Sequence, residues 1–381
     1  MMKRIVFAIL GSALAAGAAS FNADSSPGEH LFETLSCVQC HSINGKGGNA
    51  APDLGRMLDR GFTSAMLAAT MWNHAPGMWA AMRGRQIVAG DLNQQDAQDL
   101  MAFFYASRFF EKPGDAARGK RAFEHDGCAG CHGLTSSPNP NAKPVNQWDA
   151  LADPIALLDA MWNHRADMQT AAAAKGIPLP QISAQDLTDM LVYLRNLPGT
   201  RQETGVFMIQ ASGAGDTVFQ SAGCAKCHKS IDALAASVQG QTLTEIAAEM
   251  WNHAPRMAAA GAPAVKLSDS QMRDLVGAFW ASKFFTDQGR PAAGSRVFES
   301  KHCTVCHNDA SSGAPHLPAA LTAGAEFTSA SMISVLWRHG PRMLDLMKTK
   351  GLAWPHFDGP QMADLIAYLN SGASAGKSAQ P

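Results

Sequence analysis

Apolar residues recur three and four positions apart in four separate stretches of the chain, which predicts four amphipathic helices. These positions are Leu100, Phe103 and Phe104; Leu187, Leu191 and Leu194; Leu275, Ala278 and Phe279; and Leu365, Ile366 and Leu369. Before each stretch lies a polar pair, three residues apart, that can cap a helix start. The pairs are Asp91/Gln94, Ser183/Asp186, Ser268/Gln271 and Asp358/Gln361. Strand-like alternation is nearly absent, so the predicted fold class is all-α.

All eight cysteines of the 381-residue chain fall in four Cys-x-x-Cys-His motifs. The motifs are Cys37, Cys40 and His41; Cys128, Cys131 and His132; Cys224, Cys227 and His228; and Cys303, Cys306 and His307. Two cysteines on one helical turn can add to the two vinyl groups of one porphyrin, and the adjacent histidine can bind the iron. The motifs therefore predict four covalently bound haem c groups. Structural zinc or a redox dithiol are the alternatives, but neither explains a histidine at the same place in every motif.

A second pattern, Trp-x-His-x-x-x-Met, follows each cysteine motif. Its members are Trp72, His74 and Met78; Trp162, His164 and Met168; Trp251, His253 and Met257; and Trp337, His339 and Met343. His and Met four residues apart share one face of a helix, so both are candidates for the distal side of the iron. Pro76, Pro255 and Pro341 each precede the Met by two residues, which predicts a break that frees the Met from the His. Each Trp is expected to pack on the porphyrin edge and donate to a propionate, with plain core packing as the alternative.

The chain also repeats on a longer scale. From Ala106 onward it matches the segment beginning at Ala281 at a fixed offset, so that Cys128 corresponds to Cys303 and Trp162 to Trp337. We expect a duplicated two-domain unit, with repeats one and two corresponding to three and four. The predicted domains are 24–112, 113–199, 200–287 and 288–372, with the joint between the halves in 196–215 and a flexible tail at 373–381.

Charge and the N-terminus limit the partners and the compartment. With 31 basic and 32 acidic residues the net charge is −1, which argues against nucleic acid as a partner. Residues 1–20 combine Lys3 and Arg4, a short apolar run and small residues, as in a cleaved signal peptide. The apolar run is shorter than the roughly 20 residues that span a bilayer. The mature protein is therefore expected in the periplasm.

Each repeat resembles a class I c-type cytochrome domain, in its haem motif, its later Met and its closing helix with Tyr193-Leu194 or Tyr368-Leu369. The resemblance covers residues 24 to about 372 and implies four tandem monohaem domains. It implies Met78, Met168, Met257 and Met343 as distal ligands, with His74, His164, His253 and His339 as the alternative. It also implies a Pro carbonyl that accepts the proximal His N–H, for which Pro52, Pro140 and Pro315 are candidates. Repeat three has no such Pro, and repeat two carries Arg165-Ala166-Asp167 where the others have their Pro-bearing segment.

The resemblance implies a tetrahaem carrier that passes single electrons between redox proteins, because iron with two axial ligands cannot bind a small substrate. Electrons would move within each pair, one with two and three with four, and then across the central joint. One alternative is a haem enzyme with an open iron in repeat two or three, such as a peroxidase or sulfur-compound dehydrogenase. Another is the cytochrome subunit of a larger dehydrogenase or membrane-bound respiratory complex.

Overall fold

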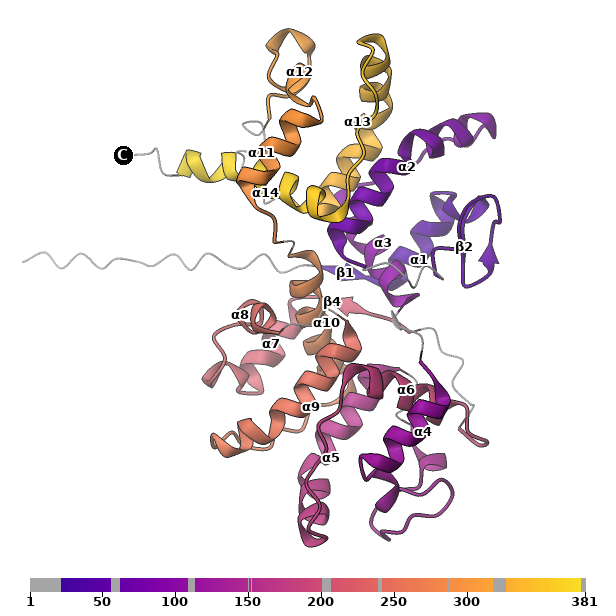
Figure 1. The fold of residues 1–381 in the computed structure, drawn as a ribbon, viewed down its shortest axis with the longest axis vertical. Helices are drawn as coiled ribbons and strands as arrows, with labels where there is room; N and C mark the ends of the chain where they lie inside the picture. Colours follow the sequence, from indigo (N-terminus) through magenta and orange to yellow (C-terminus); the bar gives the residue numbers. More distant parts are fainter. Residues whose placement is uncertain are drawn as a thin grey trace, which may run out of the picture.

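The computed structural model describes residues 22–55, 62–108, 114–149, 151, 153–200, 207–238, 242–286, 288–317 and 327–377. The predicted signal peptide lies outside these residues. The described chain is mostly helical, which confirms the all-α prediction (Figure 1). Its helices are α1 (Ser25–Thr34), α2 (Ser64–Gly84), α3 (Gln94–Ala106), α4 (Ala116–His125), α5 (Pro154–Ala174), α6 (Ala184–Arg195), α7 (Ala214–Ser221), α8 (Ile231–Ser237), α9 (Leu243–Ala259), α10 (Asp269–Phe285), α11 (Pro291–Ser300), α12 (Thr304–His307), α13 (Ser329–Thr349) and α14 (Gly359–Lys377). The short strands are β1 (Ala23–Asp24), β2 (Ser42–Ile43), β3 (Lys46–Gly47) and β4 (Gln210–Ala211).

The same helix crossing organises four units: domain 1 (α1–α3), domain 2 (α4–α6), domain 3 (α7–α10) and domain 4 (α11–α14). In each unit the first helix packs on the last. A glycine allows the close approach, because an added methyl group would overlap a backbone carbonyl oxygen of the last helix. The four pairs are Gly28 with Asp99, Gly119 with Asp189, Gly215 with Asp274, and Gly294 with Asp364. Four residues after each glycine lies a buried phenylalanine: Phe32, Phe123, Phe219 and Phe298.

Three of the four predicted helix caps are present. Ser183 and Ser268 form reciprocal caps with Asp186 and Gln271, and Gln361 N–H donates to Asp358. The Asp91/Gln94 prediction is wrong. Asn93 caps α3 with Asp96 as its partner, while Asp91 accepts hydrogen bonds from Arg338 of domain 4.

Helix α14 continues to Lys377, and the flexibility expected for 373–381 stays a prediction. Residues 378–381 lie outside the described part of the chain.

The domains pair in an order that differs from the predicted one. Helix α2 of domain 1 packs on α13 and α14 of domain 4, and α9 of domain 3 packs on α5 and α6 of domain 2. Figure 1 shows domains 1 and 4 in the upper half of the molecule and domains 2 and 3 in the lower half. The prediction that each pair consists of consecutive repeats is therefore wrong, and the predicted joint at 196–215 lies within the 2/3 half.

A repeated contact, here called the Trp–Asn contact, holds each pair together. Trp251 Nε1 donates to Pro180 O at 3.0 Å. The next side chain, Asn252, donates to Ile182 O and accepts from Ile182 N–H, both at 2.9 Å. Both acceptors lie in the segment that precedes the last helix of the paired domain. Because the amide matches one residue's N–H and C=O together, it fixes the register between the domains.

The contact is reciprocal in both halves of the molecule. Trp162 donates to Val265 O while Asn163 pairs with Leu267. Trp72 donates to Pro355 O while Asn73 pairs with Phe357. Trp337 donates to Gly90 O, but Arg338 replaces the Asn and binds Asp91 through two hydrogen bonds of 2.7 and 3.0 Å.

The two halves meet at domains 1 and 3, where equivalent residues pack on each other. Tyr105 and Trp280, which occupy matching positions of the duplication, have ring centroids 5.0 Å apart. Beside them β1 and β4 pair antiparallel, Ala23 opposite Ala211 and Asp24 opposite Gln210. The duplicated units are thus related by an approximate twofold axis through this contact.

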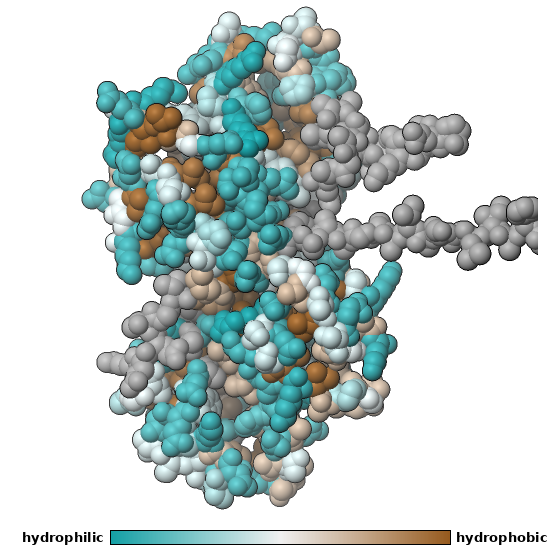
Figure 2. Space-filling view, turned by 180° about the vertical axis from the view of Figure 1, so that it is seen from behind, coloured by the Kyte–Doolittle hydropathy of each residue, from teal (hydrophilic) through white to brown (hydrophobic). Residues whose placement is uncertain are grey.

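The surface seen from behind is mostly hydrophilic, with small separate groups of hydrophobic residues on both halves (Figure 2). Within the described ranges, no helix combines the length and the apolar character that crossing a bilayer requires.

We predict that Asn252→Ala loosens the 2/3 pair. The substitution leaves Ile182 N–H and C=O without their partner, at an expected cost of about 1–3 kcal/mol. The melting temperature should fall, and hydrogen exchange at the Ile182 amide should accelerate. Asn146→Ala, at an exposed asparagine of the same half, is the control and should change neither. Unchanged exchange at Ile182 in Asn252→Ala would contradict the role of the amide.

Candidate haem sites

Each cysteine motif forms one tight turn directly after the first helix of its domain. The backbone N–H of the motif histidine donates to the carbonyl of the first cysteine in all four domains, at 2.8–2.9 Å. A residue with a left-handed backbone precedes the first cysteine in every case: Ser36, Gly127, Gly223 and His302. The turn places both sulfurs and the imidazole at one site, which is the arrangement predicted for haem attachment.

Three of the four motif histidines are oriented through Nδ1. His41 donates to Pro52 O at 2.9 Å and His307 to Pro315 O at 2.9 Å, as expected. In domain 2 the acceptor is Lys143 O at 3.0 Å, so the expectation of Pro140 is wrong. Pro144 restricts Lys143 to an extended backbone. Each of these bonds leaves Nε2 available for a metal ion.

Domain 2 has a further aromatic contact at its histidine. Trp148 packs edge-on against the His132 ring and donates to the same Lys143 carbonyl. In domain 3, among the described residues, the structure gives His228 no such acceptor.

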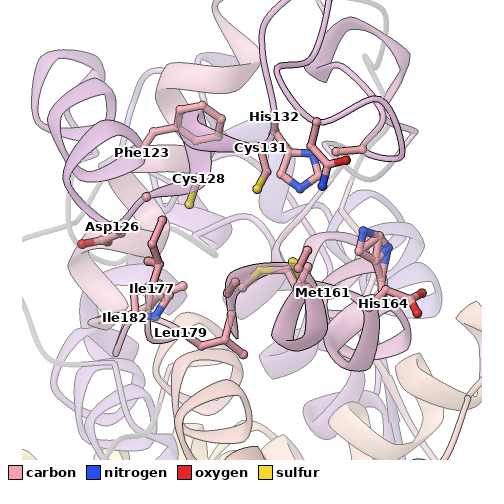
Figure 3. A pocket seen from close by; sticks show the side chains of 18 of the residues that line it. Phe123, Asp126, Cys128, Cys131, His132, Met161, His164, Ile177, Leu179 and Ile182 are labelled. Atoms are coloured by element: carbon pink, nitrogen blue, oxygen red, sulfur yellow. The ribbon is translucent and has the colours of Figure 1, made fainter. Parts of the chain in front are cut away.

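The domain 2 site is a cavity of about 650 Å³, within the range of cofactor pockets. Cys128, Cys131 and His132 lie on one side of it, and Met161 and His164 of α5 on the other (Figure 3). Apolar side chains line most of the remainder: Ile177, Leu179, Ile182, Leu187, Met190 and Leu194. Trp251 of domain 3 also lines it. Two thiols, an imidazole and an apolar cavity of this size fit a covalently attached haem.

In domains 2 and 3 the second histidine lies close to the motif histidine. The ring centroids of His132 and His164 are 6.2 Å apart, and those of His228 and His253 are 6.0 Å apart. Each of these two imidazole pairs could hold a haem iron, so His164 and His253, the alternative to the methionines, stay candidate distal ligands. Met168 also lines the cavity, so the predicted Met ligands stay a prediction.

The prolines do not break the helices that carry these residues. Pro76, Pro255 and Pro341 lie inside α2, α9 and α13, so the predicted separation of Met from His is wrong. In α2 the proline leaves Trp72 O without its helical donor, and Trp354 Nε1 of domain 4 donates to it at 2.9 Å. His74 Nδ1 donates to Thr70 O at 2.8 Å, which leaves its Nε2 free.

Burial raises the pKa of the Cys37, Cys128 and Cys303 thiols to about 11. Within the described ranges, no group of three or more His, Cys, Asp or Glu side chains that could hold a metal ion is found.

Burial also lowers the pKa of the His132 and His228 imidazoles, with a smaller effect from the facing histidine. A lower pKa favours the neutral imidazole, which is the form that binds a metal ion.

The tryptophans have a role that the sequence did not indicate. All four indole N–H groups donate to backbone carbonyls of the paired domain, so their expected bond to a propionate is not supported. Contact of the rings with the porphyrin stays a prediction, and Trp251 at the domain 2 cavity agrees with it. Sequence reasoning also missed the asparagines, although their recurrence next to three of the four tryptophans was a signal.

Comparison with known proteins agrees with this geometry. The family model described as cytochrome c matches residues 25–105, 116–198 and 291–373. Searches of curated proteins and of solved structures find no match. The matched segments contain three of the four cysteine turns together with the helices that cross beside them, and they cover more than half of the chain. This chain belongs to the cytochrome c family.

Proposed function

We propose that the protein is an exported tetrahaem cytochrome that relays single electrons between redox proteins. The observation that carries this proposal is the facing of two imidazoles across the haem site in domains 2 and 3. His132 with His164, and His228 with His253, would each hold a haem iron through two imidazoles, and a haem held in this way would supply electron exchange. The chain's own residues then hold the ligands, exclude water and set the spacing of the sites.

The geometry of domain 3 supports a total of four haems in the protein, not three. The family model does not match the segment between its second and third matches, but α7 and α10 cross there as the first and last helices do elsewhere. Cys224 and His228 form the same turn, and burial raises the pKa of Cys224 as in the other three domains.

The order of the domains in space supports a different electron route from the sequential one. Because domains 1 and 4 pair, as do 2 and 3, the closest haem partners are 1 with 4 and 2 with 3. The halves then exchange electrons through domains 1 and 3, where Tyr105 and Trp280 pack. The periplasmic location rests on the predicted signal peptide, and the donor and acceptor are expected to be redox proteins.

We predict that His164→Ala, and not Met168→Ala, changes the ligation of the domain 2 haem. Loss of the facing imidazole opens one coordination position, so one of the four ferric haems should become high-spin and bind carbon monoxide after reduction. Optical and electron paramagnetic resonance spectra measure this. Met168→Ala is the matched control, four residues along the same helix, and should keep four low-spin haems. Loss of a far-red Met–iron band in Met168→Ala would instead establish the methionine. An open haem in the unmodified protein would favour a haem enzyme.

We predict that magnetic coupling between two haems, each of which has lost its second histidine by substitution, reveals which domains pair. In His164→Ala/His253→Ala the two high-spin irons lie within one pair, so their signals should be broadened relative to the sum of the single variants. In His74→Ala/His164→Ala the two irons belong to different halves, and the signals should add. Coupling in the second variant without coupling in the first would restore the sequential pairing.

A further inference from the structure

A charged residue is buried in α5 of domain 2, the helix that packs on domain 3. Arg165 of α5 is only 8% exposed, at a position where the other three domains have small buried residues: Ala75, Ala254 and Gly340. Burial of a guanidinium costs free energy unless something compensates for the lost water. Solubility does not explain a buried arginine, so Arg165 is expected to have another role.

Arg165 has no carboxylate to neutralise it within the described ranges. The ion pairs found there involve other residues, and the Arg165 Nη1 atom is buried without a hydrogen-bond acceptor. The guanidinium carbon lies 4.6 Å from the centroid of the Trp162 ring, in a cation–π contact. Burial lowers the pKa of Arg165, but a guanidinium stays protonated at neutral pH. The position therefore carries a net positive charge.

This charge lies close to residues of the domain 2 site and to a contact with domain 3. Arg165 directly follows His164, whose ring faces His132. It also stacks on Trp162, which bonds to Val265 of domain 3. The counterpart of Trp162, Trp251, lines the haem cavity of its own paired domain. Arg165 thus stacks on the residue through which domain 2 bonds to domain 3, and it is adjacent in sequence to a histidine that lines the domain 2 cavity.

We propose that Arg165 raises the reduction potentials of the haems in domains 2 and 3, so that the 2/3 half retains electrons that arrive at the 1/4 half. Reduction takes one electron from the donor protein and adds one negative charge at the iron, without making or breaking a bond. A fixed positive charge in a region of low dielectric constant favours that addition. The proposal rests on the proposed function, because it requires haems at both sites.

Space filling alone is the competing explanation. In the 1/4 pair, Trp79 packs against Gly340 at the equivalent crossing, whereas the 2/3 pair has Ala258 and Arg165 at these positions. The large residue is thus on the domain 1 helix in the 1/4 pair and on the domain 2 helix in the 2/3 pair. Replacing Arg165 by a neutral side chain of similar length removes the charge and keeps the volume, so the two explanations can be distinguished.

The test compares Arg165→Met, Arg165→Lys and Lys120→Ala by redox titration of the purified holoprotein. Methionine keeps the volume and removes the charge, lysine keeps the charge, and Lys120 is an exposed basic residue of the same domain. In Arg165→Met one or two of the four midpoint potentials should fall, with an approximately tenfold lower equilibrium constant for reduction, or about 59 mV. Such a shift is expected for unit charges about 10 Å apart at an effective dielectric constant of about 20. Arg165→Lys and Lys120→Ala should leave the potentials near their original values.

The shift should also persist at high salt, because a buried charge is poorly screened. Unchanged potentials in a folded Arg165→Met protein, or an equal shift of all four, would overturn the proposal. Failure of the proposed function would appear separately, as fewer than four haems or an open iron in the unmodified protein.

Discussion

The pairing of a side-chain amide with one backbone residue of another domain determines how this molecule is assembled. In three of the four domains an asparagine makes both hydrogen bonds to the segment that leads into the last helix of the paired domain. The adjacent tryptophan bonds to the same segment. Two residues further along the helix lies the histidine that faces the haem site. One helical turn therefore sets the position of a haem ligand and the position of a neighbouring domain together.

This coupling explains which parts of the structure the sequence could predict. The cysteine turn is local, because the two sulfurs and the histidine are fixed by five consecutive residues. The helices follow from apolar periodicity, and three of their caps from side chains three residues apart. The domain pairing depends instead on backbone groups about 70 to 280 residues away. No local sequence pattern identifies the distant carbonyl to which an indole N–H will donate. The order of the repeats therefore predicted domain pairs that the fold does not form.

In the α2 helix, the same limit of prediction from local sequence is seen at one backbone carbonyl oxygen. Proline predicts a break because it removes a donor, and in α2 the orphaned Trp72 carbonyl would be a cost to an isolated helix. The Trp354 indole of domain 4 supplies the missing donor, so the helix continues to Gly84. The His and Met of the motif consequently stay on one helical face. Tertiary contacts thus override a reliable local rule.

The packing of domain 1 on domain 4, and of domain 2 on domain 3, gives the chain an unusual path. The chain leaves domain 1, builds both domains of the other half, and returns to complete the first half with domain 4. The two products of the duplication are therefore interlaced, each contributing one domain to each half. A single cut of the backbone between domains 2 and 3 would yield two fragments of similar size that still share two domain interfaces and the central strand pair. Such a protein should behave as one particle after a cut that would separate an ordinary tandem array.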